Sequence, residues 1–253
     1  MELRYTELNF RLIAEGQFTP SRFFGNTLRG AFGLALRRLL CTTKLSRCTD
    51  CPLIGLCIYQ ILFESRLEAG RDPSKSSFPI VSREAPHPFI LKPPLEVDPL
   101  EPGDLLEFGI NLFGKAIKLV PYIYLAVDEM GRAGIGAKRT PFKLVSILDG
   151  SGRKIFSSTS STLKRPSPEK LNLTELPKLN YSECHISFRS PCRLKVGGRI
   201  SDEFDFPVIV KNLLRRLSAI LFFYEEVRPD PPVSSNFGIE ISSLRNLLFA
   251  IRL

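Results

Sequence analysis

Apolar and polar positions alternate along residues 2–15 closely enough to predict a β-strand. After Gly16 the period lengthens to that of an α-helix, with Thr19 as the expected N-cap and Pro20 at the first helical position. The apolar positions of this helix are Phe23, Phe24, Leu28, Phe32, Leu36 and Leu39. The chain therefore opens with a strand followed by a helix.

A second series of elements begins after Asp104. The sequence LLEFGINLFG predicts a strand, KAIKLVPYIYLAVDEMG predicts a helix that is kinked at Pro121 or starts there, and PFKLVSILDG predicts a strand. Before this series, residues 71–99 are rich in Pro and Ser, which predicts a loop with short extended pieces. If one further strand lies in that stretch, the order of elements is βαββαβ, as in a ferredoxin-like unit.

The C-terminal part repeats the pattern incompletely. Residues 157–180 are rich in Ser, Pro and Lys and predict a linker, after which CHISFRSPCRLKV is strand-like and FPVIVKNLLRRLSAILFFYEE is strongly helical. We expect an α+β protein with an N-terminal domain over residues 1–156 and a short or incomplete second domain over 181–253.

Composition and charge narrow the class of protein. The 253 residues carry a net charge of +9, so the surface should attract polyanions such as nucleic acid. Charged residues interrupt every apolar run before the roughly 20 residues that a membrane span needs. The N-terminus has no secretory signal pattern, which predicts a cytoplasmic protein with reduced thiols.

Four cysteines, Cys41, Cys48, Cys51 and Cys57, have the spacing C-x6-C-x2-C-x5-C. Four soft thiolates so close in sequence can converge on one tetrahedral ion, and structural zinc is the conservative prediction. An iron–sulfur cluster fits the spacing too, and buried thiols without a metal are the remaining alternative. Cys184 and Cys192 are expected to pack as small apolar side chains.

The segment GRAGIGAKR combines three glycines with three cations, which suits close backbone approach to phosphate groups. It follows a predicted helix and precedes a strand, the opposite polarity to a dinucleotide-binding fingerprint, so a nucleotide cofactor is not expected. An ordinary flexible turn is the alternative. Further cations lie on and after the first predicted helix, at Arg22, Arg29, Arg37, Arg38, Lys44 and Arg47.

Residues suited to proton transfer are few. RNA cleavage without a metal needs a base near the attacking 2′-hydroxyl and an acid near the leaving oxygen. The two histidines, His87 and His185, are each more typical of a structural role in their sequence context. Among the residues that could substitute for histidine, Lys44 is best placed.

Several segments in order resemble one family, the CRISPR-associated endoribonucleases of the RAMP superfamily that process precursor crRNA. They are LRGAFGLALRRLL, CTDCPLIGLCIYQILFE, PFILKPP, LFGKAIKLVPYIYLAVDEMG, GIGAKRTPFKL and ISFRSPCRLK, and the resemblance covers about Phe18 to Tyr224. It implies tandem ferredoxin-like (RRM-like) domains, CRISPR repeat RNA bound in a basic cleft between them near the glycine loop, and metal-independent cleavage that leaves a 2′,3′-cyclic phosphate.

The resemblance and the charge pattern together give the expected site. The expected RNA contacts are Arg29, Arg37, Arg38, Gly131, Gly134, Gly136, Lys138 and Arg139, and the candidate catalytic residues are Lys44 and His87. In this interpretation the cysteine segment 41–57 is an insertion after the first helix that stiffens a loop. Catalysis is expected to need no cofactor.

Two departures leave a second function open. The family's further C-terminal strands and second glycine-rich segment are not matched here, and the helix where relatives often place a histidine has none. A non-catalytic crRNA-binding subunit of an effector complex is therefore the alternative to a nuclease. A general nucleic-acid-binding protein with a metal knuckle is a third possibility.

Overall fold

A computed structural model describes residues 2–53, 55–64, 85–160, 162–173, 183–188, 192–196, 199–201, 205–225 and 248–252. The chain divides into two compact units. The larger unit comprises Arg4–Arg71 and His87–Lys170, and the other comprises Met1–Leu3, Asp72–Pro86 and Leu171–Leu253.

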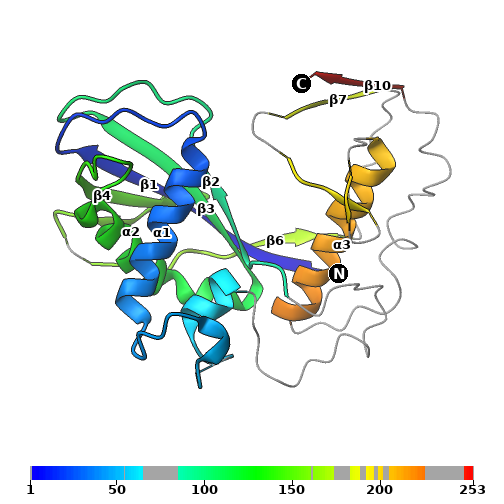
Figure 1. The fold of residues 1–253 in the computed structure, drawn as a ribbon, viewed down its shortest axis with the longest axis horizontal. Coiled ribbons are helices and arrows are strands. Elements are labelled where there is room, and N and C mark those ends of the chain that lie inside the picture. The colour runs from blue at the N-terminus through cyan, green and yellow to red at the C-terminus, as the bar shows by residue number, and fades with distance from the viewer. Residues whose placement is uncertain are drawn as a thin grey trace. The chain divides into compact units, whose positions relative to one another are not determined.

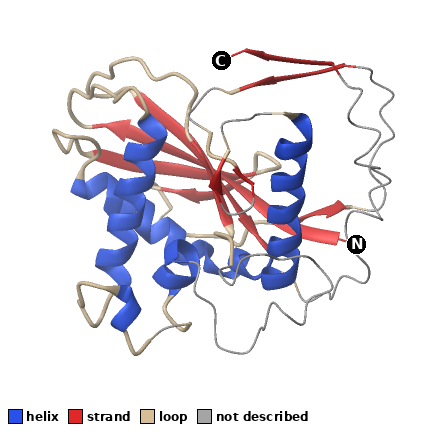
Figure 2. Cartoon of the chain, turned by 45° about the vertical axis from the view of Figure 1, so that its right-hand side comes forward, coloured by secondary structure: helices blue, strands red, loops and turns tan. Residues whose placement is uncertain are grey.

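The larger unit is built on an antiparallel sheet with two helices on one face (Figures 1 and 2). Its elements are β1 (Glu2–Ala14), α1 (Phe24–Leu40), β2 (Phe89–Lys92), β3 (Leu105–Phe113), α2 (Val120–Ala133), β4 (Phe142–Asp149) and β5 (Lys154–Ser157). The strand order is β2-β3-β1-β4-β5. A further strand, β6 (Glu169–Asn172), falls within the predicted linker and also pairs with β1, but it is not part of this order. The predicted α+β class is confirmed, and the order βαββαβ is compatible with a ferredoxin-like unit.

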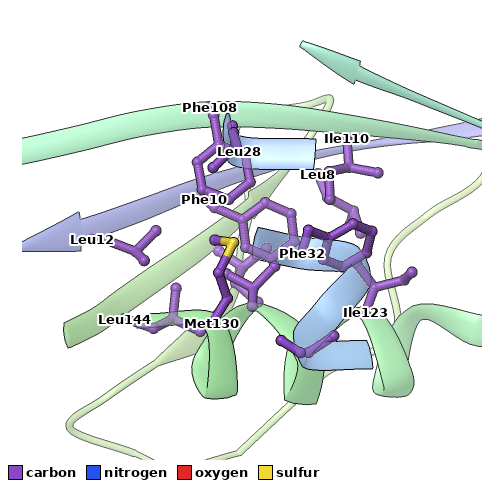
Figure 3. Close-up of a cluster of buried hydrophobic side chains, with 14 of the residues drawn as sticks. Leu8, Phe10, Leu12, Leu28, Phe32, Phe108, Ile110, Ile123, Met130 and Leu144 are labelled. Atoms are coloured by element: carbon purple, nitrogen blue, oxygen red, sulfur yellow. The ribbon is translucent and has the colours of Figure 1, made fainter. Parts of the chain in front are cut away.

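The core lies between the sheet and the two helices. The periodicities of the strands and helices predict which of their residues are buried there. Alternate residues of β1 face the helices, so Leu8, Phe10 and Leu12 are buried. Phe10 pairs in register with Phe108 of β3, and their rings stack with centroids 5.2 Å apart. Figure 3 shows Phe32 of α1 pointing into this cluster from the helix side.

Three details of the predicted elements are settled by the structure. The strand expected in the Pro-rich stretch is β2, which pairs with β3. Pro121 lies in the first turn of α2, after a 3-10 turn (Gly114–Leu119), so the helix starts there and is not kinked. The predicted start of the first helix is wrong: α1 begins at Phe24, because Phe18 and Leu100 exchange backbone hydrogen bonds of 2.8 Å that hold the preceding chain extended.

The turn between β4 and β5 is closed by the buried carboxylate of Asp149. Its Oδ1 accepts hydrogen bonds from the backbone N–H and hydroxyl of Ser151 and from the backbone N–H of Arg153. Its Oδ2 accepts from Arg153 Nε at 3.1 Å and pairs with Nη2 at 3.0 Å. Burial raises the pKa of Asp149, but the hydrogen bonds from Ser151 and Arg153 outweigh it, so the pKa is lowered.

This carboxylate should make stability depend on pH. Because the folded pKa is lowered, the stabilisation is present above the unfolded value of about 3.9 and is lost as the pH falls below it. Asp149→Asn keeps one oxygen but turns an amide N–H₂ toward Arg153, so we expect it to cost about 2 kcal/mol at pH 7. Urea unfolding at pH 7 and pH 3 measures this, and a cost that does not shrink at pH 3 would contradict it.

The described parts of the second unit are α3 (Phe206–Tyr224), a parallel pair of strands and a short hairpin. The pair is β7 (Glu183–Ser187) with β10 (Leu248–Arg252), and the hairpin joins β8 (Lys195–Val196) to β9 (Arg199–Ile200). Asp205 caps α3 by accepting a hydrogen bond from the Val208 N–H. A second ferredoxin-like domain stays a prediction, as do the boundaries at 156 and 181.

None of the helices within the described residues combines the length and apolar character that a membrane span requires.

Candidate functional site

The four clustered cysteines line a single small cavity at the C-terminal end of α1. Cys41 directly follows α1, Cys48 opens a 3-10 turn (Cys48–Asp50), and Cys57 precedes a short helical segment that continues into a π-helical turn (Gln60–Glu64). The Thr43 hydroxyl lies between two of the sulfurs, 3.9 Å from Cys41 Sγ and 3.6 Å from Cys51 Sγ. The sequence spacing therefore brings all four thiols around one space, as predicted.

The thiols differ in their surroundings. The backbone N–H of Lys44 lowers the pKa of the Cys41 thiol, with smaller contributions from Thr43 and Arg37 working against partial burial. Burial raises the pKa of Cys48, and Glu64 adds to that effect. Within the part of the chain that the structure describes, no three His, Cys, Asp or Glu side chains are already arranged to hold a metal ion. Outside this cluster, Cys192 was expected to be packed but is exposed.

Segment 58–64 folds back onto α1 through stacked aromatic rings and two arginines of the helix. The rings of Tyr59 and Phe63 stack with centroids 5.5 Å apart. The guanidinium of Arg29 lies 5.2 Å from the Phe63 centroid, and that of Arg37 lies 6.0 Å from the Tyr59 centroid. Gly33 leaves room for this packing, because a Cβ there would lie 2.9 Å from Phe63 Cε1.

Two of the expected RNA contacts therefore have structural partners. Arg29 also lies 5.1 Å from the ring centroid of Phe89, and Arg37 Nη2 donates hydrogen bonds to the carbonyls of Leu45 at 2.7 Å and Ser46 at 3.2 Å. Both arginines are half-buried, whereas Arg38 is exposed. In the sequence, the spacing of Tyr59 and Phe63, four residues apart after Cys57, was the signal that both rings lie on one side of segment 58–64.

The two candidate catalytic residues have different environments. His87 is half-buried, with Nδ1 2.9 Å from the Leu62 carbonyl and its ring 6.1 Å from that of Phe89. Lys44 is exposed and has a left-handed backbone conformation, with φ of 53°. His87 thus helps to hold segment 58–64, while the Lys44 ammonium is presented to solvent.

The glycine-rich loop is shorter than predicted and is closed by its own backbone. Gly131 belongs to α2, which ends at Ala133. Ile135 and Thr140 then exchange backbone hydrogen bonds of 2.8 and 3.1 Å, and both side chains are buried. Lys138 and Arg139 are exposed at the tip of this turn.

Its glycines serve close packing. A Cβ at Gly134 would lie 2.1 Å from the Arg139 carbonyl oxygen, and one at Gly136 would lie 3.0 Å from the Phe18 ring. Phe18 also packs edge-on against Phe24, the first residue of α1, with centroids 5.6 Å apart. The tip cations therefore lie near the N-terminal end of α1.

The expected RNA contacts consequently fall at two places and not in one cluster. Lys138 and Arg139 lie toward the start of α1, whereas Arg38 lies at its other end, together with the catalytic candidate Lys44. The 17 residues of α1 separate these ends by about 25 Å.

A family model for the AF_1859_N N-terminal domain matches residues 3–168, which is more than half of the chain. The chain belongs to this family. The AF_1859_N match includes both helices on the sheet, the cysteine segment and the glycine-rich turn. Both candidate sites are thus parts of the AF_1859_N domain.

One relative extends the similarity beyond the AF_1859_N domain. An uncharacterized protein of Archaeoglobus fulgidus is 26% identical over 225 residues, which is 88% of this chain and 70% of that protein.

Proposed function

We propose that this chain binds CRISPR repeat RNA and cleaves precursor crRNA without a metal, by attack of a 2′-hydroxyl that leaves a 2′,3′-cyclic phosphate. The supporting observation is the exposure of Lys138 and Arg139 on a backbone-closed turn beside the start of α1. Rigid presentation of two cations suits contacts to a phosphate backbone. The first turn of α1 has no acidic residue, so its helix dipole adds to the positive potential there.

The net charge of +9 and the ordered motifs shared with the RAMP endoribonucleases support the same proposal. Arg38 would contribute a second contact at the far end of α1, about 25 Å away. An RNA strand of several nucleotides would be needed to reach both places. Because Arg29 and Arg37 pack against aromatic rings and backbone carbonyls, they would stabilise this surface.

A second candidate function, a non-catalytic crRNA-binding subunit, is favoured by the environment of His87. Its Nδ1 lies 2.9 Å from a backbone carbonyl, a contact that serves packing. If His87 is structural, proton transfer has to come from Lys44 or another exposed group. The two functions share the RNA contacts and differ only in cleavage.

Labelled repeat RNA incubated with the full chain in EDTA tests the proposal. We expect saturable binding and a discrete product with a cyclic phosphate end, and Lys44→Ala should slow cleavage at unchanged affinity. Saturable binding without any product would select the non-catalytic subunit. Absence of both cleavage and submicromolar binding would overturn the proposal, and equal affinity for unrelated RNA and DNA would indicate a general nucleic-acid-binding protein.

Substitution of Lys138 tests its contact to phosphate. Lys118, an exposed lysine just before the N-terminal end of α2, provides the matched control. We expect Lys138→Ala to reduce the slope of log affinity against log salt by about 1, because one phosphate contact is lost. Lys118→Ala should leave the slope unchanged. Fluorescence anisotropy titrations at several salt concentrations measure it, and equal slopes for both variants would remove Lys138 from the site.

A further inference from the structure

A buried polar side chain, that of Gln60, is among the residues that line the cysteine cavity. Gln60 is 1% exposed. Its Nε2 donates a hydrogen bond of 3.2 Å to the Cys48 carbonyl, which fixes the amide orientation, and its buried Oε1 has no hydrogen-bond partner among the described residues. A buried acceptor without a donor is costly, and an ordered water that donates to it is the usual explanation.

The size of the cavity limits what it can hold. Its volume of about 20 Å³ has room for one particle of the size of water. A single ion fits that space, whereas the cavity would have to widen to hold an iron–sulfur cluster of several iron and sulfide atoms. The apolar side chains of Leu40, Leu53 and Tyr59 line the same cavity and would limit access of water.

The loop around the cavity has little apolar core of its own. Leu45, Leu53 and Leu56 are 40%, 38% and 67% exposed, and Cys51 is among its few buried residues. Such a loop needs another source of stability, because the aromatic packing of segment 58–64 against α1 does not extend to it. Coordination by residues at both ends and the middle of the loop would supply it, because metal binding contributes directly to folding.

We propose that Cys41, Cys48, Cys51 and Cys57 bind one zinc ion as four thiolates, and that this centre locks segment 58–64 onto α1. Zinc is the ion of choice because four soft sulfur ligands and a closed tetrahedral site suit it. Binding converts the four thiols to thiolates and releases their protons to solvent.

Closing the site requires the thiols to move together, because no three of them are already placed to hold an ion among the described residues. At a Zn–S distance of about 2.3 Å, tetrahedral sulfurs lie about 3.8 Å apart. The Thr43 hydroxyl, 3.9 Å from Cys41 Sγ and 3.6 Å from Cys51 Sγ, is close enough to donate a hydrogen bond to a thiolate at either position.

Metal analysis of the full chain tests the proposal, with Cys192→Ser as the matched control because Cys192 is exposed and outside the cavity. We expect about one zinc per chain in the native protein and in Cys192→Ser, measured by mass spectrometry of the metal. Cys48→Ser and Cys57→Ser, at half-buried positions, should lose most of it. Co²⁺ in place of zinc should give the visible absorption of a tetrahedral thiolate site in the same two proteins only.

A stability measurement separates a structural centre from adventitious binding. A strong chelator should lower the Tm of the native protein and of Cys192→Ser but leave that of Cys48→Ser unchanged. Native protein without stoichiometric zinc that also takes up no Co²⁺, or zinc retained in both cavity variants, would overturn the proposal. Iron with acid-labile sulfide would overturn the single-ion centre. None of these readouts involves RNA, so failure here is distinct from failure of the proposed function.

Discussion

Phe32→Ala should lower the free energy of unfolding by about 3–5 kcal/mol, as removal of a buried phenyl ring from a packed core does. Phe32 is fully buried on the sheet-facing side of α1. Its ring lies 5.6 Å from that of Phe63 and 6.0 Å from that of Phe89, so it joins the helix to segment 58–64 and to β2. Alanine would leave a cavity where these three elements meet.

Leu34→Ala is the matched control, because Leu34 lies two residues away on α1 and is 52% exposed. Its cost should stay within about 0.5 kcal/mol. Urea unfolding followed by circular dichroism measures both variants. If both variants lost the same free energy of unfolding, α1 could not present Phe32 to the core and Leu34 to solvent.

The periodicity of the sequence predicted β1, α1, β3, α2 and β4, since each buries one face, but the short strands β5 and β6 were not predicted. Alternation along β1 and helical spacing along α1 both reflect contact with one core. The start of α1 could not be predicted in the same way. The residue that holds the preceding chain extended, Leu100, is far from Phe18 in sequence, and local capping signals do not report such a contact.

The candidate sites were predicted in part. The cysteine spacing identified four thiols that line one cavity, because they lie close in sequence. The arginines of α1 could not be divided into exposed and packed positions, since the rings that contact Arg29 belong to Phe63 and Phe89, in later segments. Composition identifies a cation, whereas only the fold shows whether it is available to a ligand.

Gly131 and Gly30 offer a pair of helical glycines whose replacement by alanine should have opposite effects. A Cβ at Gly131 of α2 would lie 2.3 Å from the carbonyl oxygen of Phe142 in β4, a backbone atom. A Cβ at Gly30 of α1 would meet nothing within 4 Å. The two substitutions add the same methyl group to the same kind of element, so the difference isolates packing.

We expect Gly131→Ala to cost about 3 kcal/mol, because α2 must move away from a strand that is held in register with β1. Gly30→Ala should instead stabilise the protein by up to about 1 kcal/mol, since alanine has the higher helix propensity. Urea unfolding of both variants measures the two signs, and a neutral Gly131→Ala would refute the close approach of α2 to β4. Because Gly131 lies near the end of α2, which leads into the turn that carries Lys138 and Arg139, displacement of α2 should also weaken RNA binding, while Gly30→Ala should leave the affinity unchanged.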